Sequence, residues 1–547
     1  MTGGEAMVAV ALANGIDTIF GIPGAQIYPL FDAMLRLGVN TIATRHEQGA
    51  AYMAMGHAKA TGKPSAFAVV PGPGVLNTTA ALCTAMGANT PVLCLTGQVP
   101  SQFLGSGRGH LHELTDQTGT LKTLIKDAYH IADARETGAL MNRALTTMLS
   151  GRPGPVSVEM CWDTMASSYE DLAISPDPVQ IREPELDLDQ INAAAQALAG
   201  ARNPMIMCGA GAQHAAEEVL ALAEVLQAPV TAFRSGRGIV SEDHALGVSS
   251  VAARELFDDV DVLIGIGSRL EMIYMRWRDM QTYERKPANG PTLIRIDIDP
   301  DEMQRLQPDI AVVADAAAAS RALADAMAQN AAPDPDRVAM IAAAKAKTRQ
   351  AIQEIQPQMA YLDVIRDVLP RDGYFVPELS QMGFAAYYGM PIYTPRTYVS
   401  EGFQGTLGFG FQTALGVKVA CPDKAVVCVT GDGGFMFGVQ ELSTAVAHDI
   451  GLITLVFNNQ SYGNVRRDQM LRYGGRVVGS ELNNPDFVQL AESFGAAGYR
   501  VTTPEQLKPL LAKAIDADKP AVIEVMVEMG SETAPWKFIQ MPQKPWD

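Results

Sequence analysis

Residues 426–459 contain the feature that most restricts the fold of this chain: a strand, a glycine-rich turn, a helix and a second strand in succession. The apolar run at 426–429 is short and rich in valine, as in a buried parallel strand, and the sequence GDGG at 431–434 ends it. The spacing of apolar residues predicts a helix over 435–448, and the apolar run at 453–457 predicts the next strand. This βαβ order predicts an open α/β sheet of parallel strands.

Two polar residues lie where the strands of this unit end, Asp432 after the first and Asn459 after the second. Because parallel strands end at one edge of a sheet, we expect the two side chains to converge. A carboxylate and an amide oxygen suit Mg²⁺, which takes its other ligands from phosphate and water. Gly431, Gly433 and Gly434 let backbone N–H groups approach an anion. The unit predicts a metal-assisted diphosphate site; the alternative is an ordinary glycine turn, against which the paired asparagines speak.

These motifs resemble the cofactor signature of the thiamine diphosphate (ThDP) enzymes, which is GDG, a spacer and an asparagine pair. Here twenty-four residues separate Gly433 from Asn458. The chain is similar to the group of acetolactate synthase, pyruvate oxidase, benzoylformate decarboxylase and benzaldehyde lyase, and most of all to acetolactate synthase large subunits. The resemblance covers essentially the whole chain.

The length of 547 residues predicts three or four domains, and a hydrophobic content of 48% allows large cores. Proline-bearing stretches at 167–187 and 329–337 are typical of linkers. The resemblance implies three open parallel-sheet α/β domains: a pyrimidine-binding domain at 1–166, a central domain at 188–328 and a diphosphate-binding domain at 350–547.

Glu47 is the second residue on which the resemblance depends. The run 41–46 predicts a strand, and Glu47 opens the helix that follows it. In the family, the glutamate of an RHE segment binds N1′ of the aminopyrimidine, and Glu47 matches it. A carboxyl group in an apolar pocket can share its proton with that nitrogen, which prepares the 4′-imine to remove the proton from thiazolium C2. The alternative is an acidic residue that only favours the helix dipole.

The resemblance also implies the other cofactor contacts. Leu407 stands where acetolactate synthases have a methionine that props the cofactor, and Ser380 replaces a histidine common in those enzymes. The metal ligands would be Asp432, Asn459 and the backbone carbonyl of Ser461. The remaining cofactor-binding residues would be Gly24, Pro73 and Asn77 on the pyrimidine side, and Gln381, Gly405, Gly431, Gly433, Gly434, Tyr462 and Gly463 on the diphosphate side.

Gln26 and His112 are the catalytic candidates beside Glu47. Gln26 aligns with a histidine of benzaldehyde lyase, and His112 aligns with a glutamine of that lyase and of the acetolactate synthases. A histidine near the reacting carbon would act as a proton shuttle, because its ordinary pKa lies near neutrality. The alternative is a surface histidine in a loop. The arginine and lysine with which acetolactate synthases receive the second 2-oxo acid have no clear counterpart.

The resemblance therefore implies a ThDP- and Mg²⁺-dependent enzyme that forms or cleaves a C–C bond next to a carbonyl, with 2-oxo acids, aldehydes or ketones as substrates. Carboligation as in acetolactate synthase is the first expectation, and a 2-oxo acid decarboxylase or 2-hydroxyketone lyase is the alternative. A catalytically silent cofactor-binding paralogue is the hypothesis from another class, and the presence of Glu47 speaks against it. Because each site in the family is shared between subunits, we expect at least a homodimer and favour a homotetramer.

The central domain leaves the binding of FAD open. Some relatives bind FAD or ADP there, and Gly209-Ala210-Gly211 is a weak nucleotide signal because a third glycine is missing. Acetolactate synthases carry an RFDDR-like stretch where this chain reads SRLEMIYMRWRD from Ser268.

Charge and cysteine content narrow the class of protein further. The formal net charge of −18 argues against nucleic acid or an anionic membrane as a partner. The six cysteines show no metal-binding spacing, which predicts reduced thiols and a cytoplasmic location. We find no apolar stretch of membrane-spanning length.

Overall fold

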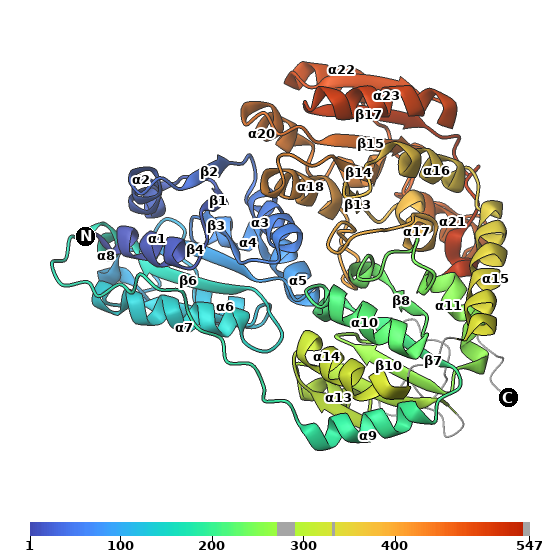
Figure 1. The fold of residues 1–547 in the computed structure, drawn as a ribbon. Helices are drawn as coiled ribbons and strands as arrows, with labels where there is room; N and C mark the ends of the chain where they lie inside the picture. The colour runs from blue at the N-terminus through green and yellow to red at the C-terminus, as the bar shows by residue number, and fades with distance from the viewer. Residues whose placement is uncertain (271–289, 331–333, 540–547) are drawn as a thin grey trace.

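The structure, a computed structural model, describes residues 1–270, 290–330 and 334–539. Three parallel sheets with helices on their faces organise it (Figure 1). This confirms the predicted fold class of three open parallel-sheet α/β domains. The stretch 167–187 runs largely without regular structure from the first sheet to the second (Figure 1). None of the helices in the described residues combines the length and hydropathy needed to cross a bilayer.

The first sheet has the strand order β2-β1-β3-β4-β6-β5. Its central strands β3, β4 and β6 are buried along their whole length, as their largely apolar sequences favour. The strands are β1 (Thr18–Gly21), β2 (Asn40–Ala43), β3 (Ser65–Val69), β4 (Val92–Gln98), β5 (Asp127–Ile131) and β6 (Val156–Cys161). The helices are α1 (Gly3–Ala13), α2 (Tyr28–Arg36), α3 (Glu47–Thr61), α4 (Pro73–Asn77), α5 (Thr79–Gly87), α6 (Gln117–Lys122), α7 (Thr137–Leu149) and α8 (Trp162–Ala166).

The second sheet has the order β12-β11-β10-β7-β8-β9. The strands are β7 (Pro204–Cys208), β8 (Val230–Ala232), β9 (Gly247–Val248), β10 (Val262–Ile266), β11 (Thr292–Asp297) and β12 (Ile310–Val313). The helices are α9 (Leu188–Ala199), α10 (Ala216–Leu226), α11 (Ser250–Leu256), α13 (Asp301–Arg305) and α14 (Ala316–Met327), and α15 (Pro335–Ala351) leads into the third domain.

The third sheet has the order β13-β14-β15-β17-β16, so β14 and β15 are neighbours. The strands are β13 (Tyr374–Pro377), β14 (Val426–Gly431), β15 (Ile453–Asn458), β16 (Ala497–Val501) and β17 (Ala521–Met526). The helices are α16 (Gln358–Val368), α17 (Gln381–Gly389), α18 (Phe409–Ala420), α19 (Asp432–Phe435), α20 (Leu442–Ala447), α21 (Gly463–Arg472), α22 (Phe487–Phe494) and α23 (Pro504–Ala517).

The helix expected over 435–448 is wrong in its bounds. The helix α19 already begins at Asp432 and ends at Phe435, and α20 starts only at Leu442. Gly438 lies between them, and a Cβ at this position would come within 2.5 Å of Gln412 Cγ on α18. The chain therefore bends where it packs against α18, and glycine, a poor helix former, makes the bend easy.

The helices α3 and α18 join the first and third domains. A Cβ on Gly56 would lie 2.0 Å from the carbonyl oxygen of Thr413, and one on Gly416 would lie 1.9 Å from that of Met53. Glycine at both positions lets the two backbones touch. A single hydrophobic cluster extends across this contact and includes residues of both domains.

Candidate active site

The ends of β14 and β15 bring Asp432 and Asn459 into one pocket, as the βαβ pattern predicts. Both side chains are buried, at 2% and 8% exposure. Burial raises the pKa of the Asp432 carboxyl above its ordinary value, because the charged form loses water. The pocket is lined by Leu379, Ser380, Gln381, Phe384, Leu407, Gly431, Asp432, Gly433, Gly434, Phe457, Asn459, Ser461, Tyr462, Gly463, Asn464, Val465 and Glu532.

Side chains from distant segments hold these two polar groups. Asn484 Nδ2 donates to Asp432 Oδ2 at 2.6 Å, and Asn459 Nδ2 donates to Glu532 Oε2 at 2.6 Å. The backbone N–H of Ser461 donates to Asn459 Oδ1 at 3.0 Å. Sequence reasoning missed Asn484 and Glu532, because each lies in a loop without a recognisable motif.

The glycines of the GDGG segment leave no room for side chains. A Cβ on Gly433 would come within 2.4 Å of the Tyr462 ring, and one on Gly434 within 2.5 Å of Glu378 Oε1. A Cβ on Gly431 would lie 3.4 Å from Ser380 Cβ, in tight contact. The backbone itself therefore forms the floor of the pocket, as the approach of an anion requires.

The predicted contacts Ser380 and Gln381 lie at the start of α17. Ser380 Oγ caps this helix by accepting from the N–H of Gly383 at 3.1 Å. Gln381 Oε1 accepts from both terminal nitrogens of Arg467 at 3.1 Å. Both side chains line the pocket while they are held by these bonds.

The segment that carries Gly405 and Leu407 approaches the pocket from the side. Leu407 lines it, whereas Gly405 stands outside the lining with a positive φ of 63°. Glu378, at 2% exposure, accepts from the N–H of Gly408 and from Thr430 Oγ1, the latter at 2.8 Å. Burial raises the pKa of Glu378 to about 7. This carboxyl, which sequence reasoning missed, fastens the segment to the end of β14.

In the first domain, Glu47 is the first residue of α3, as expected, while β2 ends at Ala43, earlier than the strand predicted for 41–46. Asn77 Nδ2 donates to Glu47 Oε2 at 3.0 Å. The predicted residues Gly24 and Pro73 lie close by: Gly24 and Gly74, the residue after Pro73, both pack against Val70. A Cβ on Gly74 would also lie 3.7 Å from Glu47 Oε1.

Gln26 and His112 meet in the same region. Gln26 Oε1 and His112 Nδ1 are 3.1 Å apart, and Gln26 Nε2 donates to the carbonyl oxygen of Leu111 at 3.0 Å. The carbonyl oxygen of His112 packs against Gly72, at 2.5 Å from where a Cβ would stand. The half-buried His112 is thus a fixed residue beside the loop of Pro73, which disfavours the alternative of a free surface histidine.

Glu441 ties this region to the third domain. Its carboxylate is fully buried and accepts from the backbone N–H groups of Arg45 at 3.1 Å and His46 at 2.9 Å. These two residues precede Glu47 in the chain. The third domain therefore holds the turn that carries Glu47, although the lining of the pocket around Asp432 includes no residue of the first domain among those described.

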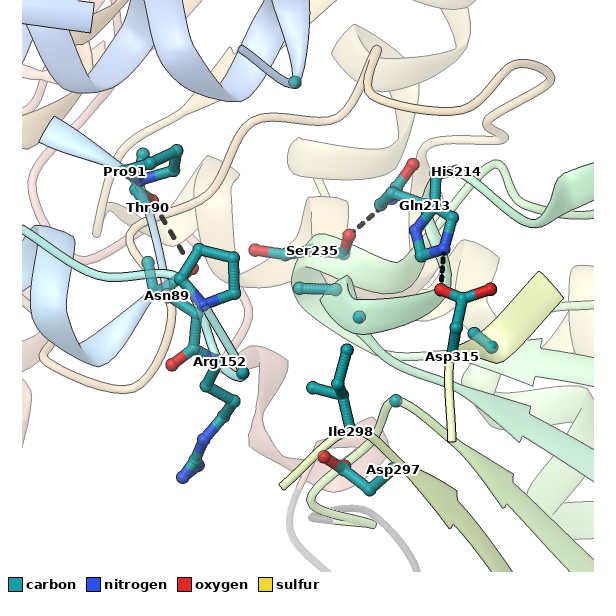
Figure 2. A pocket seen from close by; sticks show the side chains of 18 of the residues that line it. Asn89, Thr90, Pro91, Arg152, Gln213, His214, Ser235, Asp297, Ile298 and Asp315 are labelled. Atoms are coloured by element: carbon teal, nitrogen blue, oxygen red, sulfur yellow. Dashed lines mark hydrogen bonds and ion pairs between the residues drawn. The ribbon is translucent and has the colours of Figure 1, made fainter. Parts of the chain in front are cut away.

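A second pocket of about 390 Å³ lies between the first and central domains. Figure 2 shows Asn89, Thr90, Pro91 and Arg152 facing Gln213, His214, Ser235, Asp297, Ile298 and Asp315 across it. The predicted glycine turn contributes Gly211, and Ser268 and Arg269 also line the pocket. The rest of the stretch SRLEMIYMRWRD after Leu270 lies outside the described residues.

The fold and the first pocket define a class: an α/β protein with a glycine-lined polar pocket at the carboxyl edge of a parallel sheet, where ligands of open α/β sheets bind. Comparison with protein families makes this specific. The N-terminal, central and C-terminal domains of thiamine pyrophosphate enzymes match residues 1–120, 191–323 and 379–525. The chain belongs to the thiamine diphosphate-dependent enzymes, in the acetolactate synthase family.

Relatives cover nearly the whole chain. A probable acetolactate synthase large subunit of Methanococcus aeolicus is 31% identical over 97% of this chain and 93% of its own length. A probable 2-ketoarginine decarboxylase of Pseudomonas aeruginosa is 33% identical, with 93% and 90% covered. The acetolactate synthase isozyme 3 large subunit of Escherichia coli is 30% identical, with 98% and 96% covered.

The residues present fit the group that this family binds. The described residues contain no group of three or more His, Cys, Asp or Glu side chains arranged for a metal ion. Asp432 and the amide of Asn459 would offer a cation hard oxygen ligands, a type that suits Mg²⁺ when phosphate and water supply the others. The narrow backbone cradle at Gly433 and Gly434 suits the diphosphate.

Proposed function

We propose that this protein is a ThDP- and Mg²⁺-dependent enzyme that acts on 2-oxo acids, with carboligation as in acetolactate synthase as its leading reaction. The observation that carries the proposal is the convergence of the buried Asp432 and Asn459 at the ends of the adjacent strands β14 and β15. The three domains would have the bounds 1–166, 188–328 and 350–547. Six free cysteines support a cytoplasmic location.

On the diphosphate side, Asp432, Asn459 and the carbonyl oxygen of Ser461 would hold Mg²⁺. When bound, ThDP supplies the carbon nucleophile and the electron sink of the reaction. Leu407 would support the bend of the cofactor between its rings, at the edge of the pocket that it lines. The other residues assigned to cofactor binding on this side are Ser380, Gln381, Gly405, Gly431, Gly433, Gly434, Tyr462 and Gly463.

On the pyrimidine side, Glu47 would bind N1′ and hold the proton that is exchanged with the ring. Asn77 orients the Glu47 carboxylate through its hydrogen bond. Gly24 and Pro73 belong to the loops around it. Gln26 and His112 would face the substrate, where the hydrogen-bonded histidine moves a proton to or from the substrate oxygen.

The two half-sites support a homodimer as the smallest active form, with a homotetramer as the favoured assembly. The pocket around Asp432 and Asn459, which we call the diphosphate pocket, draws its lining from residues 379–532 of the chain. The side-chain partner of Glu47, in contrast, is Asn77 of the first domain, and the third domain reaches this region through Glu441, which binds the backbone of Arg45 and His46. In the family each complete site joins one half from each of two subunits, and this arrangement would unite the two half-sites here.

The reaction is tested with a panel of 2-oxo acids, each offered alone and with a second 2-oxo acid or an aldehyde. We expect products whose mass corresponds to 2-hydroxy-2-alkyl-3-oxo acids or acyloins. Release of an aldehyde and CO₂ alone would favour the decarboxylase, which the similarity to the 2-ketoarginine decarboxylase supports. Cleavage of added 2-hydroxyketones would favour the lyase. Tight ThDP binding without any turnover would favour the silent paralogue.

His112→Ala is expected to lower kcat by about 100-fold, since a positioned acid–base group contributes roughly 10² to 10⁴ in rate. The affinity for ThDP, measured by calorimetry, should stay unchanged because His112 lies outside the diphosphate pocket. His110→Ala is the matched control, because this ring stacks on Phe103 at 3.9 Å in the same loop. If both variants lowered kcat equally, His112 would have a structural role in this loop and would not transfer a proton.

The visible absorption spectrum of the purified protein tests whether it binds FAD. The pocket in Figure 2 has the size of a small-molecule site. A yellow protein carries the flavin, and a colourless protein that is active with ThDP and Mg²⁺ works without it.

A further inference from the structure

Residues 528–539 form a strap that leaves the sheet after β17 and covers one side of the diphosphate pocket. Its backbone is anchored on the third domain: the N–H of Thr533 donates to the carbonyl oxygen of Gln356 at 2.9 Å, and Gln358 Nε2 donates to the carbonyl oxygen of Thr533 at 2.8 Å. Trp536 Nε1 donates to Asn464 Oδ1 at 3.0 Å, and the Trp536 ring packs on Phe384. The strap is therefore a fixed wall of the pocket.

Glu532 is the residue of this strap that enters the pocket. It is 9% exposed, and its Oε2 accepts from Asn459 Nδ2 at 2.6 Å. A carboxylate can only accept hydrogen bonds, so this contact fixes which end of the Asn459 amide is nitrogen. The amide oxygen, which is the atom that a cation requires, then faces Ser461 and accepts from its backbone N–H and its Oγ, both at 3.0 Å.

The negative charge of Glu532 also favours the binding of a cation. Asp432 and Glu532 line one pocket, and two buried carboxylates favour a cation between or beside them. The guanidinium of Arg467 donates to the backbone carbonyl oxygen of Glu532 at 3.1 Å and to Gln381 Oε1. Burial raises the pKa of the Glu532 carboxyl, and the positive charge of Arg467 acts to lower it. Arg467 thus holds the backbone of Glu532, while the carboxylate points to Asn459.

We propose that Glu532 is a positioning residue for the divalent cation, which locks the amide of Asn459 and adds negative charge beside Asp432. The inference rests on the proposed ThDP and Mg²⁺ dependence. It assigns a part of the cation affinity to the strap, which lies 73 residues beyond Asn459 in the chain. Partners that orient metal ligands typically change metal affinity by about 10- to 100-fold when they are replaced.

The test titrates Mg²⁺ into the whole chain in the presence of saturating ThDP. Calorimetry measures the binding of Mg²⁺ during this titration. Glu532→Gln keeps the size of the side chain and one acceptor oxygen but loses the charge, and Glu532→Ala loses both. We expect the apparent Kd for Mg²⁺ to rise by about 10-fold in the first variant and by more in the second. Turnover of Glu532→Gln should recover at high Mg²⁺ concentration, which a purely structural defect would not allow.

Ser531→Ala is the control for the fold of the strap, because Ser531 is exposed and its Oγ donates only within the strap, to the carbonyl oxygen of Glu528. Its Kd for Mg²⁺ should equal that of the wild type. The proposal is overturned if both Glu532 variants bind Mg²⁺ like the wild type, or if Ser531→Ala loses as much affinity as they do. A wild type without Mg²⁺-dependent uptake of ThDP would instead refute the proposed function itself.

Discussion

Glu47→Gln should lower kcat by at least about 100-fold, because the amide cannot exchange a proton with the aminopyrimidine. The size of the side chain and an acceptor for the Asn77 amide are retained. Binding of ThDP and Mg²⁺ should therefore persist, since the diphosphate pocket is built from other residues. Product formation by mass spectrometry measures the first effect, calorimetry the second, and exchange of the C2 proton with deuterium, followed by NMR, locates the defect at cofactor activation.

Asp32→Asn is the control for Glu47→Gln, because Asp32 is an exposed carboxylate on α2 in the same domain. It should leave turnover and C2 exchange unchanged. A wild type that turns over no faster than Glu47→Gln would favour the silent paralogue over an enzyme.

Asp432→Asn should abolish Mg²⁺-dependent binding of ThDP and, with it, turnover. The variant replaces the carboxylate that a hard cation prefers by a neutral amide. The apoprotein should unfold at the same or a higher temperature than the wild type, since a buried charge without a cation is unfavourable. ThDP with Mg²⁺ at a hundred times its Kd stabilises a binding-competent protein by about 2.7 kcal/mol. Thermal unfolding should show this stabilisation in the wild type and not in Asp432→Asn.

Asp423→Asn replaces an exposed carboxylate in the turn before β14 and serves as the control for Asp432→Asn. It should show the full stabilisation by the cofactor. If Asp432→Asn were stabilised like this control, the cation site would have to lie elsewhere.

Glu47→Gln and Asp432→Asn, when they are combined in one dimer, also test whether the site is shared between two chains. In a heterodimer of Glu47→Gln and Asp432→Asn chains, one site carries both changes and the other carries neither. Random pairing should restore about a quarter of the wild-type activity. Sites formed within one chain would restore none, which would contradict a site shared between two chains.

The sequence was sufficient to predict the parts of the site that follow strand ends and helix starts. Asp432 and Asn459 could be placed together because apolar runs marked β14 and β15, and parallel strands end at one edge. Glu47 could be placed because the apolar pattern starts a helix there. Both inferences need only local patterns and the geometry of one βαβ unit.

Other features of the site and of the fold depend on contacts between distant segments. No local sequence pattern predicts such contacts. Asn484 and Glu532 reach Asp432 and Asn459 from loops 52 and 73 residues away. The break between α19 and α20 follows from the packing of Gly438 against Gln412 on another helix. Helix propensity depends on the residue and its neighbours in sequence. It does not include contacts with distant segments, and such tertiary packing can override it.

The touching backbones of α3 and α18 have a consequence for how this scaffold diversifies. At Gly56 and Gly416 the backbones of the two helices are in direct contact, so the first and third domains cannot shift relative to each other without a clash. We expect such a frame to acquire new substrates by exchanging single side chains, such as the proposed substrate-side residues Gln26 and His112, rather than by reshaping its domains. This agrees with relatives named for different 2-oxo acid reactions that still align with nearly the full length of the chain.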